Sequence, residues 1–333
     1  MQLPKSVVIR STGCYYPERV LTNADLERMV DTSDEWIRTG TGIRERRIAE
    51  PSQASSDLAY EAATRALASA EWTAKDTDHI IVATVTADYP FPSCACSLQG
   101  KLGATRAAAF DLSAACTGFI YGLKIARSLI LAGQAKRILL LGVETLSRIV
   151  DYTDRSTCVL FGDGAGAVTL EGSDDPQAGI RSVVIGSDGD QVDLLLMPGG
   201  GSRNPSSVDT VEKKMHAISM AGNEVFKIAV RAMEAVSRQA VAEAGLKLDD
   251  IDIFIPHQAN IRIIDAIAKR LEVPPERLVV TIEKFGNTSA ASVPIALDET
   301  VRAGRIKPGD HVAMAAFGGG ITWGAAVVRW GGR

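Results

Sequence analysis

The chain of 333 residues lacks any apolar run long enough to span a bilayer. Its longest runs, such as residues 138–142, have the length of a strand, whereas a membrane helix needs ~20 residues. Basic residues are also too few for a nucleic-acid binder, because 36 Lys and Arg face 40 Asp and Glu and the formal net charge is −4. We therefore expect a cytoplasmic protein that uses neither a membrane nor nucleic acid.

Cysteine and histidine are sparse. The five cysteines, at positions 14, 94, 96, 116 and 158, form no disulfide framework, and there are only four histidines. Cys94 and Cys96 are separated by one residue, too few for a zinc or redox pair. The sequence therefore predicts no metal site, a reducing compartment, and a thiol that is free for chemistry.

Strand-like and helix-like segments alternate along the chain, which is typical of the α/β class. We expect helices over 56–70, 117–132, 224–244, 262–271 and 288–303, and strands over 6–10, 80–85, 107–112, 137–143, 252–256, 278–282, 311–316 and 323–330.

The second half of the chain repeats the first. Cys116 and Asn287 each open an expected helix that stops at a glycine, at position 133 in one case and 304 in the other, so both ends of the two helices share an offset of 171. Further upstream, an apolar strand recurs at an offset of 174. These matches predict a duplicated α/β unit, with one half over 1–172 and the other over 173–333. Equivalent loops would then meet near a pseudo-twofold axis, with Cys116 and Asn287 facing one site.

Three residues are candidates for chemistry. Cys116 follows a strand and opens a helix, whose N-terminus favours the thiolate; the alternative is a buried structural cysteine. His257 ends an apolar strand, where α/β proteins place functional side chains, although a lone histidine can also be structural. Asn287 is first of all a good N-cap, and only the repeat suggests a functional role.

Two glycine-rich segments lie between strands. Residues 317–324 (Phe-Gly-Gly-Gly-Ile-Thr-Trp-Gly) predict a tight turn whose N–H groups could form an oxyanion hole. Residues 162–166 lack the Lys-Ser/Thr of a phosphate loop and predict a structural turn.

Taken together, these motifs resemble β-ketoacyl-[acyl-carrier-protein] synthase III over essentially the whole chain. The resemblance is carried by residues 115–119 (Ala-Cys-Thr-Gly-Phe), 256–260 (Pro-His-Gln-Ala-Asn), 286–292 (Gly-Asn-Thr-Ser-Ala-Ala-Ser) and 317–324, with support from 34–37, 41–46 and 220–227. It implies the thiolase-like fold, with two α/β halves in a layered αβαβα arrangement, and a homodimer without a cofactor.

The resemblance also implies residue roles. It assigns catalysis to Cys116, His257 and Asn287, and the oxyanion hole to the N–H groups of Cys116 and Gly319. It assigns CoA and pantetheine binding to Trp36, Arg155, Asn223, Phe226 and Asn260, contact with acyl carrier protein to Lys227, Arg262, Lys269 and Arg270, and the acyl pocket to Phe91, Phe161 and Phe317. Core packing remains the alternative for Trp36, and a solvated helix face remains the alternative for Lys269 and Arg270.

The implied activity is a decarboxylative Claisen condensation that initiates fatty acid synthesis. A short acyl-CoA, with acetyl-CoA as the first candidate, would acylate Cys116, and malonyl-acyl carrier protein would supply the attacking enolate. The alternatives are a specialised acyltransferase or condensing enzyme of secondary metabolism, a Cys-His hydrolase and a non-catalytic scaffold.

One position departs from the family pattern. Gly40 stands where many members carry an arginine, and Arg38 lies two places earlier. We therefore expect weaker binding of the CoA nucleotide, or compensation by Arg38.

Overall fold

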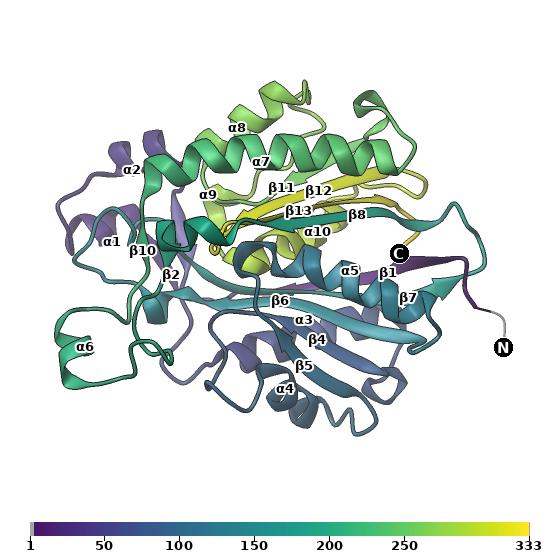
Figure 1. Ribbon diagram of the computed structural model, residues 1–333, viewed down its shortest axis with the longest axis horizontal. Helices are drawn as coiled ribbons and strands as arrows, with labels where there is room; N and C mark the ends of the chain where they lie inside the picture. Colours follow the sequence, from purple (N-terminus) through teal and green to yellow (C-terminus); the bar gives the residue numbers. More distant parts are fainter. Residues whose placement is uncertain (1–2, 333) are drawn as a thin grey trace.

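A five-stranded mixed sheet is built from the first half of the chain (Figure 1). The structure is a computed structural model and describes residues 3–332. The strand order is β1 (Ser6–Tyr15), β7 (Asp163–Ser173), β6 (Arg137–Thr145), β4 (His79–Ala83) and β5 (Ala108–Leu112). β4 runs parallel to β5 and β6, whereas β7 is antiparallel to both β6 and β1.

A second sheet repeats this arrangement in the order β11 (Ile253–Pro256), β12 (His311–Gly318), β13 (Thr322–Arg329) and β8 (Gly179–Ser187). β11 is parallel to β12, and the other pairs are antiparallel. A bridge between Phe254 and Leu278 lies beyond β11, in the place that β5 takes in the first sheet. The remaining strands form two short antiparallel pairs: β2 (Val20–Thr22) with β3 (Glu45–Arg47), and β9 (Leu195–Leu196) with β10 (Ser219–Met220).

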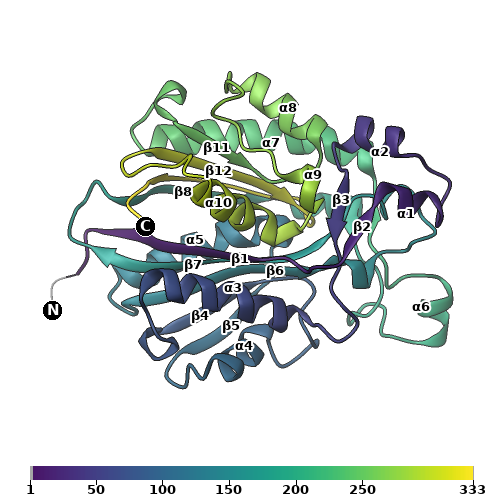
Figure 2. The same cartoon turned by 180° about the vertical axis from the view of Figure 1, so that it is seen from behind.

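Helices cover both sheets and fill the space between them. The central layer holds α5 (Gly118–Leu131) and α10 (Ser292–Arg302), which share one apolar core with both sheets. Figures 1 and 2 show α3 (Ser55–Ala70) and α4 (Cys94–Leu102) on one outer side and α7 (Gly222–Glu243) and α8 (Ile261–Arg270) on the other. This is the expected αβαβα layering. Shorter helices lie toward one end: α1 (Asn23–Glu27), α2 (Asp34–Thr41), α6 (Val208–Glu212) and α9 (Ile282–Phe285). Within residues 3–332 no helix is long and apolar enough to cross a bilayer.

The elements at the centre of the repeat share one offset in the structure. Five pairs of elements share an offset of 174 in sequence number, beginning at 74 and 248, 79 and 253, 115 and 289, 118 and 292, and 137 and 311. The offset of 171 for the central helices is therefore wrong: Cys116 corresponds to Ala290, and Asn287 lies three positions earlier. The expected 171 came from the glycines that end the helices, and α10 is three residues shorter than α5.

Three local expectations are also wrong. Residues 278–282 form no strand beyond the bridge at Leu278, because Gln258 Oε1 accepts the N–H groups of Thr281 and Ile282 at 2.8 and 3.1 Å, and the short helix α9 begins at Ile282. Asn287 does not open the central helix, which is preceded by the 3₁₀ turn Ser289–Ala291 (η6). The glycine-rich residues 162–166 lie mostly within β7.

Candidate active site

A pocket of about 440 Å³ brings together Cys116, His257 and Asn287. Seven more of the expected site residues line it: Trp36, Phe161, Asn223, Phe226, Asn260, Arg262 and Phe317. The three reactive side chains are buried, with exposed fractions of 9, 2 and 7%. The pocket therefore joins residues from both halves of the chain, as expected from the repeat.

Cys116 lies in the short 3₁₀ turn Ala115–Thr117 (η2), directly before α5. Burial raises the pKa of its thiol to about 12, and a hydrogen bond to the Ser289 side chain opposes that rise. Desolvation therefore opposes the thiolate that the helix N-terminus is expected to favour.

The turn between β12 and β13 packs directly against the nucleophile. A Cβ atom added to Gly318 would lie 2.7 Å from the backbone nitrogen of Cys116 and 3.2 Å from its Cβ. Gly319 follows at the end of β12, and a Cβ there would lie 3.0 Å from the carbonyl oxygen of Leu195. Glycine is therefore required at Gly318 for the two backbones to approach.

His257 follows the last residue of β11, and its backbone N–H donates to the Ala315 backbone carbonyl at 2.7 Å. Its Nδ1 is 2.5 Å from Ser292 Oγ. Burial lowers the pKa of the imidazole to about 3, so the ring is neutral at physiological pH. With Nδ1 engaged by Ser292, Nε2 is the ring nitrogen left for a substrate.

Asn287 is fixed by its own backbone. Its N–H donates to the Leu160 carbonyl at 2.8 Å, and its carbonyl accepts the Gly162 N–H at 3.0 Å. Its Oδ1 accepts the Ser289 N–H at 2.9 Å. The Nδ2 group is therefore the part of the side chain that remains free to donate into the pocket.

Trp36 and Arg155 meet at the pocket mouth. The Arg155 guanidinium lies 5.3 Å from the centre of the Trp36 ring and donates to the Asp31 carbonyl at 2.9 Å. Trp36 is 47% exposed, which disfavours the core-packing alternative. Gly40 lines the same mouth, with open space where a Cβ would be.

The basic residues divide into two groups. Arg262 lines the mouth and lies 5.6 Å from the Phe226 ring, and exposed Lys227 is the next residue on α7. Lys269 and Arg270 lie at the other end of α8, ~10 Å along the helix axis. Arg270 pairs with Glu234 at 2.7 Å.

Phe91 does not line the pocket of its own chain, and it is 86% exposed. The pocket wall also contains residues that sequence reasoning missed. Its apolar part includes Leu195, Met220, Val225, Ala229 and Met233. The last three recur at every fourth position along α7, so the helical periodicity could have indicated them.

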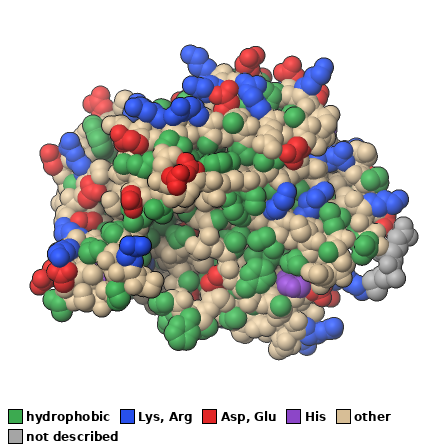
Figure 3. Space-filling model, viewed as in Figure 1, with side chains coloured by type: hydrophobic (Ala, Val, Ile, Leu, Met, Phe, Trp, Pro, Cys, Tyr) green, Lys and Arg blue, Asp and Glu red, His purple; other side chains and the backbone are tan. Residues whose placement is uncertain are grey.

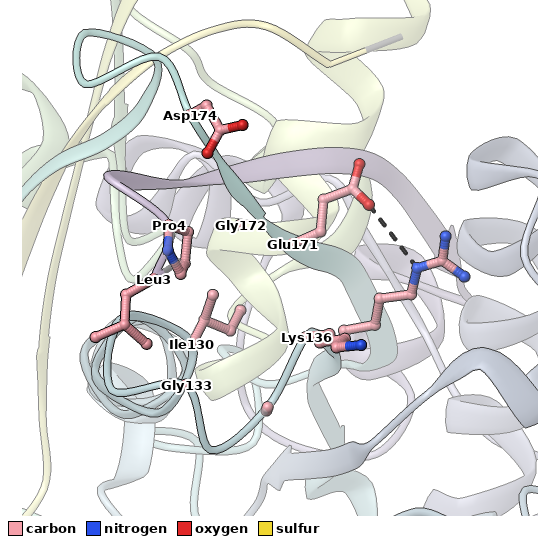
Figure 4. Close-up of a pocket in the computed structure, with 10 residues that line it drawn as sticks. Leu3, Pro4, Ile130, Gly133, Lys136, Glu171, Gly172 and Asp174 are labelled. Carbon is pink, nitrogen blue, oxygen red and sulfur yellow. Dashed lines mark ion pairs between the residues drawn. The ribbon is translucent and has the colours of Figure 1, made fainter. Parts of the chain in front are cut away.

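A second hollow lies at the far end of α5, ~20 Å along the helix from Cys116 (Figure 4). It is lined by Leu3 and Pro4, by Ile130, and by an ion pair in which Arg137 Nε is 3.9 Å from Glu171. Its lining residues include neither cysteine nor histidine. Among residues 3–332 no group of three or more His, Cys, Asp or Glu side chains could hold a metal ion.

Known proteins resemble this chain over most of its length. The family profile described as 3-Oxoacyl-[acyl-carrier-protein (ACP)] synthase III matches residues 110–189, and its C-terminal counterpart matches 241–330. A curated relative from Caldanaerobacter subterraneus subsp. tengcongensis, named beta-ketoacyl-[acyl-carrier-protein] synthase III, is 54% identical over 97% of each chain.

Solved structures agree as well. A 3-oxoacyl-[acyl-carrier-protein] synthase III from Aquifex aeolicus is 48% identical, with a TM-score of 0.91 over 97% of this chain and 100% of that one. A priming β-ketosynthase of a polyketide biosynthetic pathway is 37% identical, with a TM-score of 0.92 over 99 and 98% of the two chains. The chain therefore belongs to the β-ketoacyl-[acyl-carrier-protein] synthase III family.

Proposed function

We propose that this protein is a condensing acyltransferase that joins a short acyl group from acyl-CoA to malonyl-acyl carrier protein and so initiates fatty acid synthesis. The observation that carries the proposal is one buried pocket in which a thiol faces two neutral hydrogen-bond donors, His257 and Asn287. This combination suits an enolate, which needs donors and no strong base.

In the first step, the sulfur of Cys116 attacks the thioester carbonyl, and an acyl-enzyme forms as CoA leaves. The tetrahedral oxyanion would be held by the backbone N–H groups of Cys116 and Gly319. The close packing of Gly318 on Cys116 supports this role, because it fixes the turn and the nucleophile relative to each other. Removing one such donor lowers the rate by about 10²–10³-fold.

In the second step, malonyl-acyl carrier protein loses carbon dioxide, and the resulting enolate attacks the acyl group on Cys116. His257 Nε2–H and Asn287 Nδ2 would donate to the enolate oxygen. The contact of 2.5 Å between the Ser292 hydroxyl and His257 Nδ1 supports this, because a hydroxyl that donates there leaves the proton of the neutral ring on Nε2. The thiol, amide and imidazole supply every group that this chemistry needs, so the proposal includes no cofactor.

The substrates would enter through the mouth at Trp36 and Arg155, with the pantetheine arm along Asn223, Phe226 and Asn260. Phe161 and Phe317 would border the acyl group. Arg262 and Lys227 would attract the acidic carrier protein, since they lie at or beside the mouth. The expectation for Lys269 and Arg270 has less support, because Arg270 is already paired with Glu234.

We also propose a cytoplasmic homodimer formed through β5 and its surroundings. β5 is the edge strand of its sheet, and an unpaired edge favours association. Figure 3 shows hydrophobic side chains gathered over α5 and β5. Exposed hydrophobic side chains in the loop after β4 extend this face: Val85, Tyr89 and Phe91. Phe91 would then contribute to the acyl pocket of the partner subunit, and light scattering would test the dimer.

The division into halves at 172/173 is likewise a proposal. The repeated strand order and the common offset of 174 support it. The boundary falls at the end of β7, before β8 starts the second sheet. Residues 1–2 and 333 lie outside the described residues.

The alternative, a specialised condensing enzyme of secondary metabolism, is less favoured. The polyketide priming synthase is similar in fold at 37% identity, whereas relatives named beta-ketoacyl-[acyl-carrier-protein] synthase III reach 54%.

The test is a mass-spectrometric assay with acetyl-CoA and malonyl-acyl carrier protein, with Cys116→Ala as the control. Acetoacetyl-carrier protein from the wild type alone is expected. Product only from longer or branched acyl-CoA would keep the mechanism and change the acyl preference. An acylated Cys116 without condensation product would indicate a simple acyltransferase, and no acylation by any donor would overturn the proposal.

A further inference from the structure

Arg46 is a buried cation in the middle of β3, and it closes the segment 41–46, a motif that the mechanism above does not use. Its exposed fraction is 0%. Burial lowers the pKa of its guanidinium to about 10, so the group is still charged at neutral pH. Its three hydrogen bonds all go to uncharged oxygen atoms. A buried charge held in this way costs free energy that an apolar side chain would avoid, which points to a role beyond packing.

One amino group of Arg46 holds the segment that fixes Asn287. Its Nη2 donates to the Val159 carbonyl at 2.7 Å, and Val159 lines the pocket. The next residue, Leu160, accepts the Asn287 N–H at 2.8 Å, and the Gly162 N–H donates to the Asn287 carbonyl at 3.0 Å. The guanidinium is therefore one hydrogen bond away from the strand-like segment on which Asn287 is mounted.

The stem of Arg46 also packs against both sides of this contact. A Cβ atom added to Gly162 would lie 3.1 Å from the Arg46 Cβ, and one added to Gly286 would lie 3.3 Å from it. Gly286 directly precedes Asn287 and has φ of 64°, so its backbone conformation favours glycine. The side chain of Arg46 thus supports Asn287 from the segment before it and from the segment paired with it.

The other amino group of Arg46 leads to the pocket mouth. Its Nη1 donates to Asn23 Oδ1 at 2.9 Å and to the Leu21 carbonyl at 3.2 Å. Asn23 in turn donates from Nδ2 to Asp34 Oδ1 at 2.8 Å. Asp34 is the first residue of α2, the helix that presents Trp36 at the mouth. A second arm of the network therefore ends on the helix beside which acyl-CoA would enter.

We propose that Arg46 is a positioning residue that holds Asn287 in place for condensation and, through Asn23, holds α2 in place for acyl-CoA. The planar guanidinium suits this task because it donates in two fixed directions, which an ammonium group does not. Its hydrogen bonds involve neither Cys116 nor Gly319, so the chemical step of acylation depends less on it. The inference rests on the proposed two-step function.

The experiment measures the two steps separately in Arg46→Met, which keeps an unbranched stem and removes the guanidinium. The acyl-enzyme is formed with saturating acetyl-CoA, freed of CoA and mixed with malonyl-acyl carrier protein, and both reactions are followed by mass spectrometry. Condensation of the preformed acyl-enzyme should slow by about 100-fold, the cost of displacing a positioned group by ~1 Å. The KM for acetyl-CoA should rise, whereas the acylation rate at saturation should stay close to wild type.

Two further variants separate positioning from stability. Asn23→Ala cuts only the arm to α2, so it should raise the KM for acetyl-CoA and leave condensation of the acyl-enzyme at the wild-type rate. Ser11→Ala is the matched control for a lost buried hydrogen bond. The Ser11 hydroxyl is fully buried in β1, donates to the Ala66 carbonyl at 2.6 Å and does not line the pocket, so its loss should lower the melting temperature and change neither step.

Hydrogen exchange reports on the positioning without any reaction. The amides of Gly162 and Asn287 are the two that join the segments beside Arg46. In Arg46→Met they should exchange about tenfold faster, the equivalent of one lost hydrogen bond, and they should stay at wild-type rates in Asn23→Ala and Ser11→Ala.

An equal loss in acylation and condensation in Arg46→Met would overturn the proposal, as would unchanged exchange at Gly162 and Asn287 or a loss of condensation in Asn23→Ala. If Arg46→Met does not fold, Arg46→Lys decides, since it keeps the charge and loses the fork, and it should show the same split between the two steps. If no acyl-CoA donor modifies Cys116 in the wild type, the proposed function fails, and the exchange rates still decide whether Arg46 holds Asn287.

Discussion

The two loops at the centre of the molecule, η2 and η6, share a backbone and differ in chemistry. Ala115 and Ser289 begin them with φ of 45° and 46°, and the helices that follow start at an offset of 174. At this offset Cys116 corresponds to Ala290. One loop therefore presents a nucleophile, and its equivalent carries an alanine at the same position.

The same asymmetry recurs at other positions of the site. At the offset of 174, His257 pairs with Ala83, Ser292 with Gly118, and Glu144 with Gly318. In each pair one half has a polar side chain and the other has alanine or glycine. The reason is space: a Cβ on Gly118 would lie 2.8 Å from the Ala83 Cβ, and one on Gly318 would lie 2.7 Å from the Cys116 nitrogen. The centre has room for one set of functional groups, so a duplicated unit could become an enzyme only by losing its symmetry there.

Moving the thiol from η2 to the equivalent loop η6 should have the largest effect on activity. The double variant Cys116→Ala, Ala290→Cys should form no acyl-enzyme and should lose at least about 10³-fold in condensation rate. Ala290 is fully buried and does not line the pocket, so a thiol there cannot reach the substrate. Mass spectrometry after mixing with acetyl-CoA checks this, and an acyl adduct on the introduced thiol would show that the backbone alone creates the nucleophile.

Glu144 is a buried carboxyl that only one half of the chain carries, and Glu144→Gln should change how the free energy of unfolding depends on pH. A folded pKa of about 7 in place of 4.5 means that the folded wild type keeps a proton which the unfolded chain releases. The contribution of this proton to the free energy of unfolding is therefore present at and below pH 4.5. It is lost as the pH rises through 7, by about 3 kcal/mol. Glutamine does not titrate, so the free energy of unfolding of the variant relative to wild type should be about 3 kcal/mol more favourable at pH 8 than at pH 4.5. Urea unfolding at both values measures this, and an equal difference at both would contradict the burial of an ionisable Glu144.

Gly318→Ala places a methyl group where the equivalent position carries Glu144. Because the added Cβ meets the Cys116 backbone, we expect the nucleophile to shift and the acylation rate to fall by about 100-fold. Gly100→Ala on α4, where a Cβ has open space, is the control and should keep wild-type rates. Stopped-flow acylation by acetyl-CoA distinguishes the two, and a wild-type rate for Gly318→Ala would show that the turn is free to move.

Ser292→Ala removes the hydroxyl that sits where the other half has Gly118. His257 Nδ1 would lose its partner, so the ring would no longer be held in one tautomer. We expect condensation to slow by about tenfold, the worth of one hydrogen bond, with acylation of Cys116 unchanged. Separate assays of the two steps check this, and an equal loss in both would instead indicate a general disturbance of the pocket.

Sequence reasoning could find Cys116 and His257 because each stands out after an apolar strand. Asn287 was found through the repeat, and all three lie in family motifs. It could not predict that Glu144 is fully buried, because a charged residue near the end of an apolar strand is usually exposed. Only the correct offset of 174, which pairs it with Gly318, would have drawn attention to it. The halves and layers were predictable from the alternation of strands and helices along the chain. The absence of a strand over 278–282 was not, because it depends on hydrogen bonds to the side chain of Gln258, which is distant in sequence.

The pocket mouth is formed in part by α2, which is not among the repeated elements. A substitution there should have the smallest effect on the kinetics. Gly40→Arg restores the usual family residue at a position with open space, close to Trp36. An arginine there would add a second contact to the CoA nucleotide beside Trp36 and should lower the KM for acyl-CoA about threefold, since exposed cation–π contacts are weak, and should leave kcat unchanged. Gly100→Arg, equally open but remote, adds the same charge as a control. Steady-state kinetics at low and high salt measure both, and an unchanged KM for Gly40→Arg would show that Arg155 and Arg38 already supply the attraction that Gly40 lacks.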